Sequence, residues 1–379
     1  MAGASRKQTI TRIVITGGPC AGKTTAMSWI QNAFTEKGYL VLFVDETATQ
    51  LSRGGAPWKL TRDNKEYQYC VTRLMLAKEE AFTDIAKTFE ADKVLVVCDR
   101  GALDNRAYMS EEEFRYVLGK LRTTEVELRD HYDAVFHLVT AAKGAEEFYT
   151  HANNAARYET VQEAVESDDR LIAAWTGHPH LRIIDNRYSF DEKMLALIRE
   201  ISSFLGEPRP METKRKYLIA RPDPAVLGRR PNCRHVEITQ AYLRSDIPGE
   251  TIRIRQRGCE GSYVYFKTRK RTVDGRRIEM EERLTRREFR DLLLQADPEF
   301  RTLRKDRWCL SESGLYYNID IFPEWDSRAL LEVELYGADD RVVFPEGIEV
   351  IREVTGEKEF TNPEIARIRK KQAGAVLDE

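Results

Sequence analysis

Residues 17–24, GGPCAGKT, constrain the fold of this chain more than any other segment, because they match the pattern GxxxxGK[ST]. The apolar run at 12–16 has the length and β-branched content of a buried strand, and a helical pattern follows from 23 to 37. Between a strand and a helix, the N–H groups of such a loop converge on phosphate, and the helix N-terminus adds positive potential. The segment therefore predicts an α/β domain that binds ATP or GTP with Mg²⁺.

The loop and the ends of neighbouring strands supply the candidate site residues. Lys23 would reach the β- and γ-phosphates and Thr24 would hold Mg²⁺. Asp99 ends an apolar strand, where such folds hold the Mg²⁺ shell, and Glu46 ends another. Arg157 could stabilise developing charge, or it could be a surface arginine paired with Glu159 or Glu163. The predicted catalytic residues are Lys23, Glu46, Asp99 and Arg157, the nucleotide-binding residues are Gly17, Gly18, Gly22, Lys23, Thr24, Thr25 and Arg100, and the Mg²⁺ ligands are Thr24 and Asp99.

Two domains are expected along the chain. In residues 1–205 strands at 12–16, 39–45, 93–99, 134–140 and 181–186 alternate with helices, which predicts a parallel sheet with helices on both faces. Residues 206–211 are rich in proline, glycine and charge and are expected to be a linker. Strands of period two dominate 212–360, with one helix at 285–296, and predict an antiparallel β-barrel. Residues 361–379 are expected to form a charged helical tail.

Charged side chains recur at every second position on at least five strands of the second domain. Arg253, Arg255 and Arg257 share one face of one strand, because side chains alternate along a strand. Alternating charges on a single strand would indicate the solvated face of a sheet. Because five strands carry them, the pattern predicts a charged interior that binds a polyphosphate with Mg²⁺ or Mn²⁺. The predicted anion-binding residues are Lys214, Lys216, Arg253, Arg255, Arg257, Lys267, Arg269, Arg277, Lys305 and Arg307, and the predicted metal ligands there are Glu212, Asp320, Glu332 and Glu334.

The first half resembles the NadR-like, kinase-type AAA family over about residues 10–205. The resemblance rests on GGPCAGKTT, VDETAT, DRGALDNRAYM, NNAARYET and GHPHLRIIDN, in that order. It implies that Gly17, Gly22, Lys23, Thr24 and Asp99 contact nucleotide or Mg²⁺, and that Arg157 belongs to a lid. It does not separate adenine from guanine.

The second half resembles the CYTH-type triphosphate-tunnel superfamily over about residues 210–355. The opening ExExK motif becomes Glu212-Thr-Lys214-Arg-Lys216, and Asn318 stands where an acidic residue is common. The RxRxR, RxExE, KxR and ExE elements match. Since two carboxylates are replaced, the resemblance implies anion binding more than hydrolysis.

Together the halves resemble the TRP-like channel translocation regulator family, kinase-like P-loop domains fused to a CYTH-like domain. That resemblance implies GTP binding, a phosphoinositide headgroup in the tunnel and a role in membrane traffic with a peripheral membrane contact. The alternative is an enzyme, either a kinase of a small metabolite or a triphosphatase acting in the tunnel.

Net charge and cysteine content limit the classes of partner and the cellular compartment that we expect. A net charge of −2 and a pI near 6.4 predict no nucleic-acid partner. Six cysteines without a CxxC pair, and an N-terminus without an apolar signal region, are typical of a cytoplasmic protein.

Overall fold

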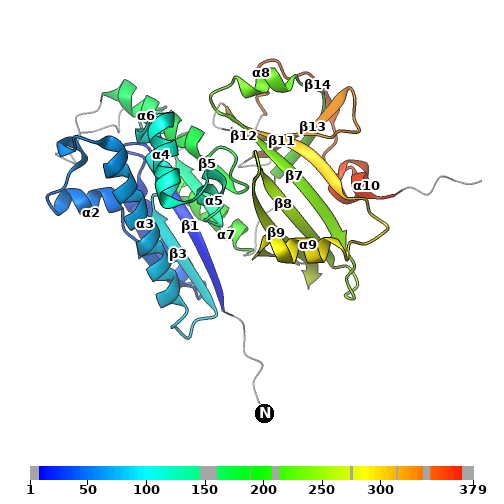
Figure 1. Ribbon diagram of the computed structural model, residues 1–379, viewed down its shortest axis with the longest axis horizontal. Coiled ribbons are helices and arrows are strands. Elements are labelled where there is room, and N and C mark those ends of the chain that lie inside the picture. Colours follow the sequence, from blue (N-terminus) through cyan, green and yellow to red (C-terminus); the bar gives the residue numbers. More distant parts are fainter. Residues whose placement is uncertain are drawn as a thin grey trace, which may run out of the picture.

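Two lobes lie side by side in the computed structural model, an α/β domain and an antiparallel β domain (Figure 1). The structure describes residues 8–145, 160–187, 189–206, 213–273, 276–312, 315–335 and 342–368, and only the backbone at 213–214, 271–273, 276–280 and 334.

The first domain contains a parallel sheet with the strand order β2-β3-β1-β4-β5. Its strands are β1 (Thr9–Gly17), β2 (Leu40–Val44), β3 (Lys93–Asp99), β4 (Ala134–Leu138) and β5 (Leu181–Ile184). Its helices are α1 (Lys23–Thr35), α2 (Thr47–Arg53), α3 (Asn64–Ala86), α4 (Glu111–Leu121), α5 (Glu125–Arg129), α6 (Val161–Trp175) and α7 (Phe190–Phe204), with short helices η1 (Trp58–Leu60) and η2 (Ala102–Tyr108).

Helices cover both faces of this sheet, which confirms the predicted architecture of the first domain. Ile13 and Ile15 of β1 pack on one face with α1 and α7, in a cluster that includes Phe34 and Leu197. Val14 points to the other face, where it packs with residues of η2 and α4 to α6. Apolar residues at successive positions of β1 are therefore required, because each face of a parallel sheet must be buried.

The second domain contains an antiparallel sheet of nine strands with the order β10-β9-β8-β7-β11-β12-β13-β6-β14. The strands are β6 (Thr213–Ala220), β7 (Cys233–Leu243), β8 (Thr251–Cys259), β9 (Ser262–Val273), β10 (Arg276–Leu284), β11 (Leu303–Glu312), β12 (Leu315–Ile321), β13 (Arg328–Leu335) and β14 (Val350–Glu353). The helices are α8 (Pro224–Gly228), α9 (Arg286–Leu293), η4 (Lys358–Phe360) and α10 (Asn362–Ala366).

This sheet is open, so the prediction of a closed barrel is wrong. Among the described strands no pair joins β10 to β14. One face carries an apolar cluster that includes Ile219, Tyr317 and Leu331. The other face is covered in two places, by the first domain at its centre and by η4 and α10, which bring Phe360 and Ala366 against it. Burial by these segments replaces the closure that a barrel would provide.

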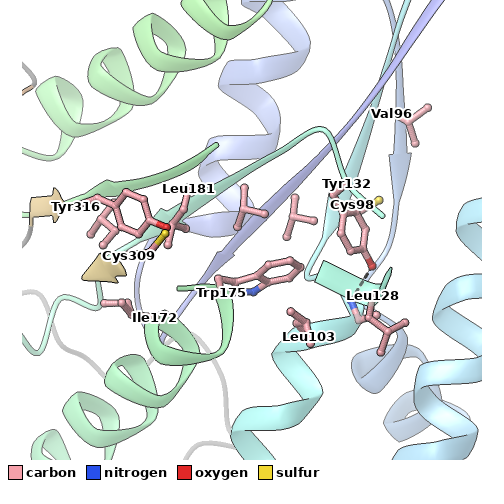
Figure 2. Packing of buried hydrophobic residues seen from close by; sticks show 14 of the residues in the cluster. Val96, Cys98, Leu103, Leu128, Tyr132, Ile172, Trp175, Leu181, Cys309 and Tyr316 are labelled. Atoms are coloured by element: carbon pink, nitrogen blue, oxygen red, sulfur yellow. Dashed lines mark hydrogen bonds between the residues drawn. The ribbon is translucent and has the colours of Figure 1, made fainter. Parts of the chain in front are cut away.

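A single hydrophobic cluster crosses the boundary between the domains (Figure 2). Trp175, fully buried at the end of α6, lies between Tyr132 and Leu103 of the first domain and Tyr316 and Cys309 of the second. The hydroxyl of Tyr316 accepts from the backbone N–H of residue 177 at 3.0 Å and donates to the carbonyl of residue 178 at 3.2 Å. The two domains therefore share part of their core.

Most predicted elements of both halves are present with small shifts of their ends. The predicted helix at 285–296 is the shorter α9. Most of the expected linker, 207–211, and the end of the expected tail, 369–379, lie outside the described residues. Of the expected tail, the described part contains the short helix α10.

Candidate functional site

The phosphate loop connects β1 to α1 in the predicted position. Gly17 ends β1 with φ of 147°, and a Cβ there would lie 2.1 Å from the carbonyl oxygen of Leu138, so only glycine fits. Cys20 is left-handed, with φ of 54°. Gly22 forms the N-cap of α1, also left-handed, and places Lys23, Thr24 and Thr25 in the first turn. Thr24 and Thr25 are exposed there, on the surface where a ligand would lie.

Lys23 folds back over the loop. Its ammonium donates to the carbonyl oxygens of Gly17 at 2.9 Å and Gly18 at 3.3 Å. Burial, together with the charge of Arg100, lowers the pKa of Lys23 to about 8. A polyphosphate beside this ammonium would stabilise its charged form, since an opposite charge favours ionisation.

Asp99 and Arg100 lie beside the loop, because β3 pairs with β1 and places Asp99 opposite Ile15. Asp99 Oδ1 and Arg100 Nη1 are buried and have no hydrogen-bond partner among the described residues. A buried polar atom without a hydrogen-bond partner destabilises the fold by about 1–3 kcal/mol. The pair therefore fits a ligand that carries both a cation, for Asp99, and an anion, for Arg100. Thr24 and Asp99 would hold Mg²⁺, which would neutralise the charge of the phosphates, and Arg100 would contact a phosphate oxygen.

Glu46 and Arg100 form an ion pair at this edge of the sheet. Arg100 Nε lies 2.5 Å from Glu46 Oε1, and Thr49 donates to the other oxygen at 2.7 Å. Burial alone would raise the pKa of Glu46, but the charges of Arg100 and Lys23 and the hydrogen bonds from Thr49 and Arg100 together outweigh it and lower the pKa to about 2. Burial raises the pKa of Asp99, although Lys23 opposes this. Glu46 therefore stays charged beside Arg100 and holds its guanidinium in place.

Three buried residues at the loop were not singled out for a role from the sequence. Asp104 accepts from Thr16 at 2.6 Å and from the indole of Trp175 at 2.8 Å, which ties β1 to η2 and α6. Asp168 and Lys193 contact the backbone of the loop itself. The signal in the sequence was weak: an acidic and a basic residue inside two amphipathic helices look like parts of a solvated face.

The charged face of the second sheet contains a compact ion-pair cluster. Asp320 accepts from Lys305 at 2.5 Å and from Arg307 Nε at 2.7 Å, and Lys216 lies 2.8 Å from Glu332. Arg307 also reaches Glu332 at 3.6 Å. Burial would raise the pKa of Glu332, but Arg307 and Lys216 lower it to about 2. Lys305 and Lys216 also donate to Asn362 and to the carbonyl of residue 360, so the C-terminal segment closes over this cluster.

Arg253 and Arg255 continue the charged face on β8. Arg253 donates to Thr268 at 3.3 Å, and its Nε is buried without a partner among the described side chains and backbone. Arg255 lies 3.1 Å from Glu281. Five predicted anion-binding residues with described side chains, Lys216, Arg253, Arg255, Lys305 and Arg307, therefore share one face of the sheet.

Arg257 does not belong to an anion site, which corrects the prediction made for it. It is 2% exposed, and its guanidinium donates to both oxygens of Asp130 at 3.0 Å and to the carbonyl of residue 177 at 2.5 Å. Burial alone would raise the pKa of Asp130, but Arg129 and Arg257 lower it to about 2. At this end of β8 the charged face lies against the first domain, so the arginine joins the domains.

Lys267 and Arg269 lie on the opposite face from Arg253 and Arg255, so their predicted placement is also wrong. The register of β8 and β9 pairs Lys267 with Ile254 and Arg269 with Ile252, whereas Arg253 pairs with Thr268. Their ion-pair partners are Glu282 at 3.4 Å and Glu250 at 3.6 Å.

The remaining predicted residues lie outside what the structure describes. These are Arg157 and Glu212, and the side chains of Lys214, Arg277 and Glu334. Among the described residues no group of three or more His, Cys, Asp or Glu side chains is placed to hold a metal ion. Asp320 and Glu332 are instead engaged by cations, and a metal in the second domain stays a prediction. None of the described helices combines the length and apolar character that a membrane span requires.

Comparison with known proteins supports the prediction that the first domain binds a nucleotide. Residues 12–193 match the model of a family described as an AAA domain, which agrees with a nucleotide-binding loop at 17–24. No curated protein matches the chain.

Some solved structures align with part of this chain. One described as the inorganic triphosphatase NE1496 is 24% identical, covers 42% of this chain and 95% of its own, and has a TM-score of 0.31. PH1819 protein from Pyrococcus horikoshii OT3 is 19% identical, covers 35% and 80%, and has a TM-score of 0.24. TM-scores of this size do not establish a shared fold.

Proposed function

We propose that the chain is a nucleotide-dependent anion-binding protein. The phosphate loop binds Mg²⁺ with ATP or GTP, and the charged face of the second sheet binds a polyphosphate or an inositol-phosphate headgroup. The observation that carries the first part is a pair of buried atoms beside the ammonium of Lys23, Asp99 Oδ1 and Arg100 Nη1, which have no hydrogen-bond partner among the described residues. Nucleotide phosphates and their metal ion supply the missing partners of both signs.

The second part is supported by the cations around Asp320 and Glu332. Each carboxylate is bound by two cations, an arrangement that leaves little room for a catalytic metal ion, whereas Arg253 has a buried Nε without a hydrogen-bond partner among the described residues. Anion binding is therefore favoured over hydrolysis by a triphosphatase. A nucleotide-timed role in membrane traffic rests on the sequence resemblance alone.

Nucleotide binding by Lys23→Ala tests the first part. We expect the affinity for Mg²⁺–ATP and Mg²⁺–GTP to fall about 100-fold, because a charged hydrogen bond to phosphate is lost. Titration calorimetry measures it, with Lys37→Ala as the matched control, since Lys37 follows the same helix and donates to Ser202 away from the loop. Unchanged affinity in Lys23→Ala would exclude this loop as the site.

A kinase of a small hydroxyl-bearing metabolite is the second candidate. It is favoured by the positions of Glu46, just after β2, and Asp99, at the end of β3, because both lie at the carboxyl edge of the parallel sheet, where α/β folds bind their substrates. Phosphate release from ATP and GTP distinguishes the two. Turnover without an acceptor supports a nucleotide-timed binding protein, whereas nucleotide binding with turnover only after an acceptor is added supports the kinase.

Vesicles test the headgroup proposal. We expect phosphatidylcholine vesicles containing a phosphoinositide to sediment the protein at physiological salt, and soluble inositol hexakisphosphate to release it. Binding that follows vesicle charge alone, without competition by the soluble headgroup, would contradict a headgroup site.

A further inference from the structure

A network of buried polar side chains lies beneath the phosphate loop. Its two charged members are Asp168 on α6 and Lys193 on α7, which are 0% and 4% exposed. Neither takes part in the candidate chemistry at Asp99 and Arg100. Charges are seldom buried so deeply unless hydrogen bonds satisfy them, so the partners of these two side chains indicate their role.

Asp168 holds the beginning of the loop. Its Oδ1 accepts from the backbone N–H of Gly18 at 3.0 Å, from that of Thr140 at 3.2 Å and from His137 Nε2 at 2.9 Å. Its Oδ2 accepts from Lys143 at 2.8 Å. The contact with the loop is close, because a Cβ at Gly18 would lie 2.8 Å from Oδ1 and 3.0 Å from the Cβ of Asp168. The loop backbone therefore rests directly on the carboxylate.

Lys193 holds the end of the loop. Its ammonium donates to the carbonyl of Ala21 at 3.1 Å, to that of Val139 at 2.7 Å and to Asn186 Oδ1 at 2.7 Å. An ammonium has three protons, so three acceptors satisfy it. The carbonyl of Ala21, at the end of the loop, is therefore held by a buried ammonium.

The two attachments belong to one network. Asn186, which accepts from Lys193, donates to the carbonyls of Thr140 and Lys143 at 2.7 and 2.8 Å. Thr140 in turn donates its hydroxyl to the carbonyl of Pro19 in the loop. Segments that follow β4 and β5 thus connect the acidic and the basic attachment.

We propose that Asp168 and Lys193 are positioning residues that hold the phosphate loop in its binding conformation before a nucleotide arrives. This inference rests on the proposed nucleotide function of the loop. A glycine-rich loop loses much backbone freedom when it is ordered, and a loop ordered in advance does not lose it again on binding. The carboxylate and the ammonium fix opposite ends of the loop, so the backbone between them keeps one conformation.

Asp168→Asn tests the acidic attachment, with Asp169→Asn as the matched control. Asp169 is exposed and binds the same Lys143 at 2.7 Å, and no hydrogen bond in the described part of the chain joins its side chain to the loop. Asparagine presents an N–H₂ group to Lys143 or to the donors around Oδ1, so the carboxylate cannot be replaced there. We expect the affinity for Mg²⁺–ATP or Mg²⁺–GTP to fall about 10- to 100-fold in Asp168→Asn and to stay unchanged in Asp169→Asn.

Lys193→Met tests the basic attachment, with Arg199→Met, exposed on the same helix, as its control. Hydrogen–deuterium exchange without nucleotide gives a second readout for both variants. We expect faster exchange of the amides of residues 17–24 in Asp168→Asn and Lys193→Met, and unchanged exchange in β3 and in the second domain.

Wild-type exchange in the loop together with wild-type affinity would overturn the proposal. So would faster exchange spread evenly through the chain, which would mean a general loss of stability. If the wild-type protein binds no nucleotide, the proposed function fails, and the exchange of the loop still reports whether these residues hold it.

Discussion

At the scale of single residues, Arg100 combines an unusual backbone with an unusual environment. Its φ of 69° lies in the left-handed region, which residues other than glycine and asparagine seldom adopt. Its Nε is paired with Glu46, whereas its Nη1 is buried without a partner in the described part of the chain. Strained residues persist where the surroundings determine them, and such residues cluster at ligand sites. The conformation of Arg100 is therefore consistent with a guanidinium aimed at phosphate.

Glu46→Gln should destabilise the protein by about 1–3 kcal/mol at pH 7, because Arg100 loses its charged partner in a largely buried place. The folded-state pKa of Glu46, about 2, lies below the usual value, so the stabilisation is present above pH 4.5 and is lost as the pH falls toward 2. Chemical denaturation of both proteins at pH 7 and at pH 3 measures this. The difference between them should shrink at pH 3, and a constant difference would contradict the ion-pair explanation.

At the scale of elements, the register between strands decides which charged side chains of the second sheet share a face. Arg253 and Arg255 of β8 lie on the same face of the sheet as Lys305 and Arg307 of β11. The register of β7, which pairs with both strands, places them there. Lys267 of β9 lies on the other face, although its own strand alternates just as regularly. Alternation within a strand is a local property, whereas the match between strands depends on which residues pair.

Arg255→Ala should weaken binding of inorganic tripolyphosphate by about 1–3 kcal/mol, because one charged hydrogen bond to the anion is lost. Lys267→Ala is the control, since it removes one cation from the neighbouring strand on the opposite face. Both variants are measured in a Lys23→Ala background, so that tripolyphosphate at the phosphate loop does not contribute. Equal losses in the two variants would indicate a general charge effect and not a site on the charged face.

At the scale of the whole molecule, the domains are joined by a buried ion pair and a shared core. Arg257 and Asp130 are 2% and 5% exposed, and Trp175 and Tyr316 belong to one hydrophobic cluster that crosses the boundary. A buried pair adds little by itself, because desolvation offsets the attraction, but removing one partner leaves an uncompensated charge. The pair therefore fixes how the domains meet more than it adds to stability.

Arg257→Met should lower the free energy of unfolding by about 3–5 kcal/mol, because Asp130 would stay buried after losing one of the two arginines that pair with it in the described part of the chain. The double variant Arg257→Met with Asp130→Asn should recover part of that loss. Denaturation followed by tryptophan fluorescence and circular dichroism measures both. A loss in the double variant equal to the sum of the single losses would mean that the two side chains do not interact.

Sequence alone determined what depends on local pattern: the phosphate loop between strand and helix, the alternation that gives a covered parallel sheet, and the charge stripes of the second domain. These features follow from the periods of strand and helix, which are read within a few residues. Only the tertiary structure decided which stripes share a face, that the second sheet stays open, and that Arg257 joins the domains. It also decided that Asp168 and Lys193 meet the loop. Those outcomes depend on strand register and on contacts between segments up to about 170 residues apart, such as Lys193 with Ala21, for which no local period exists.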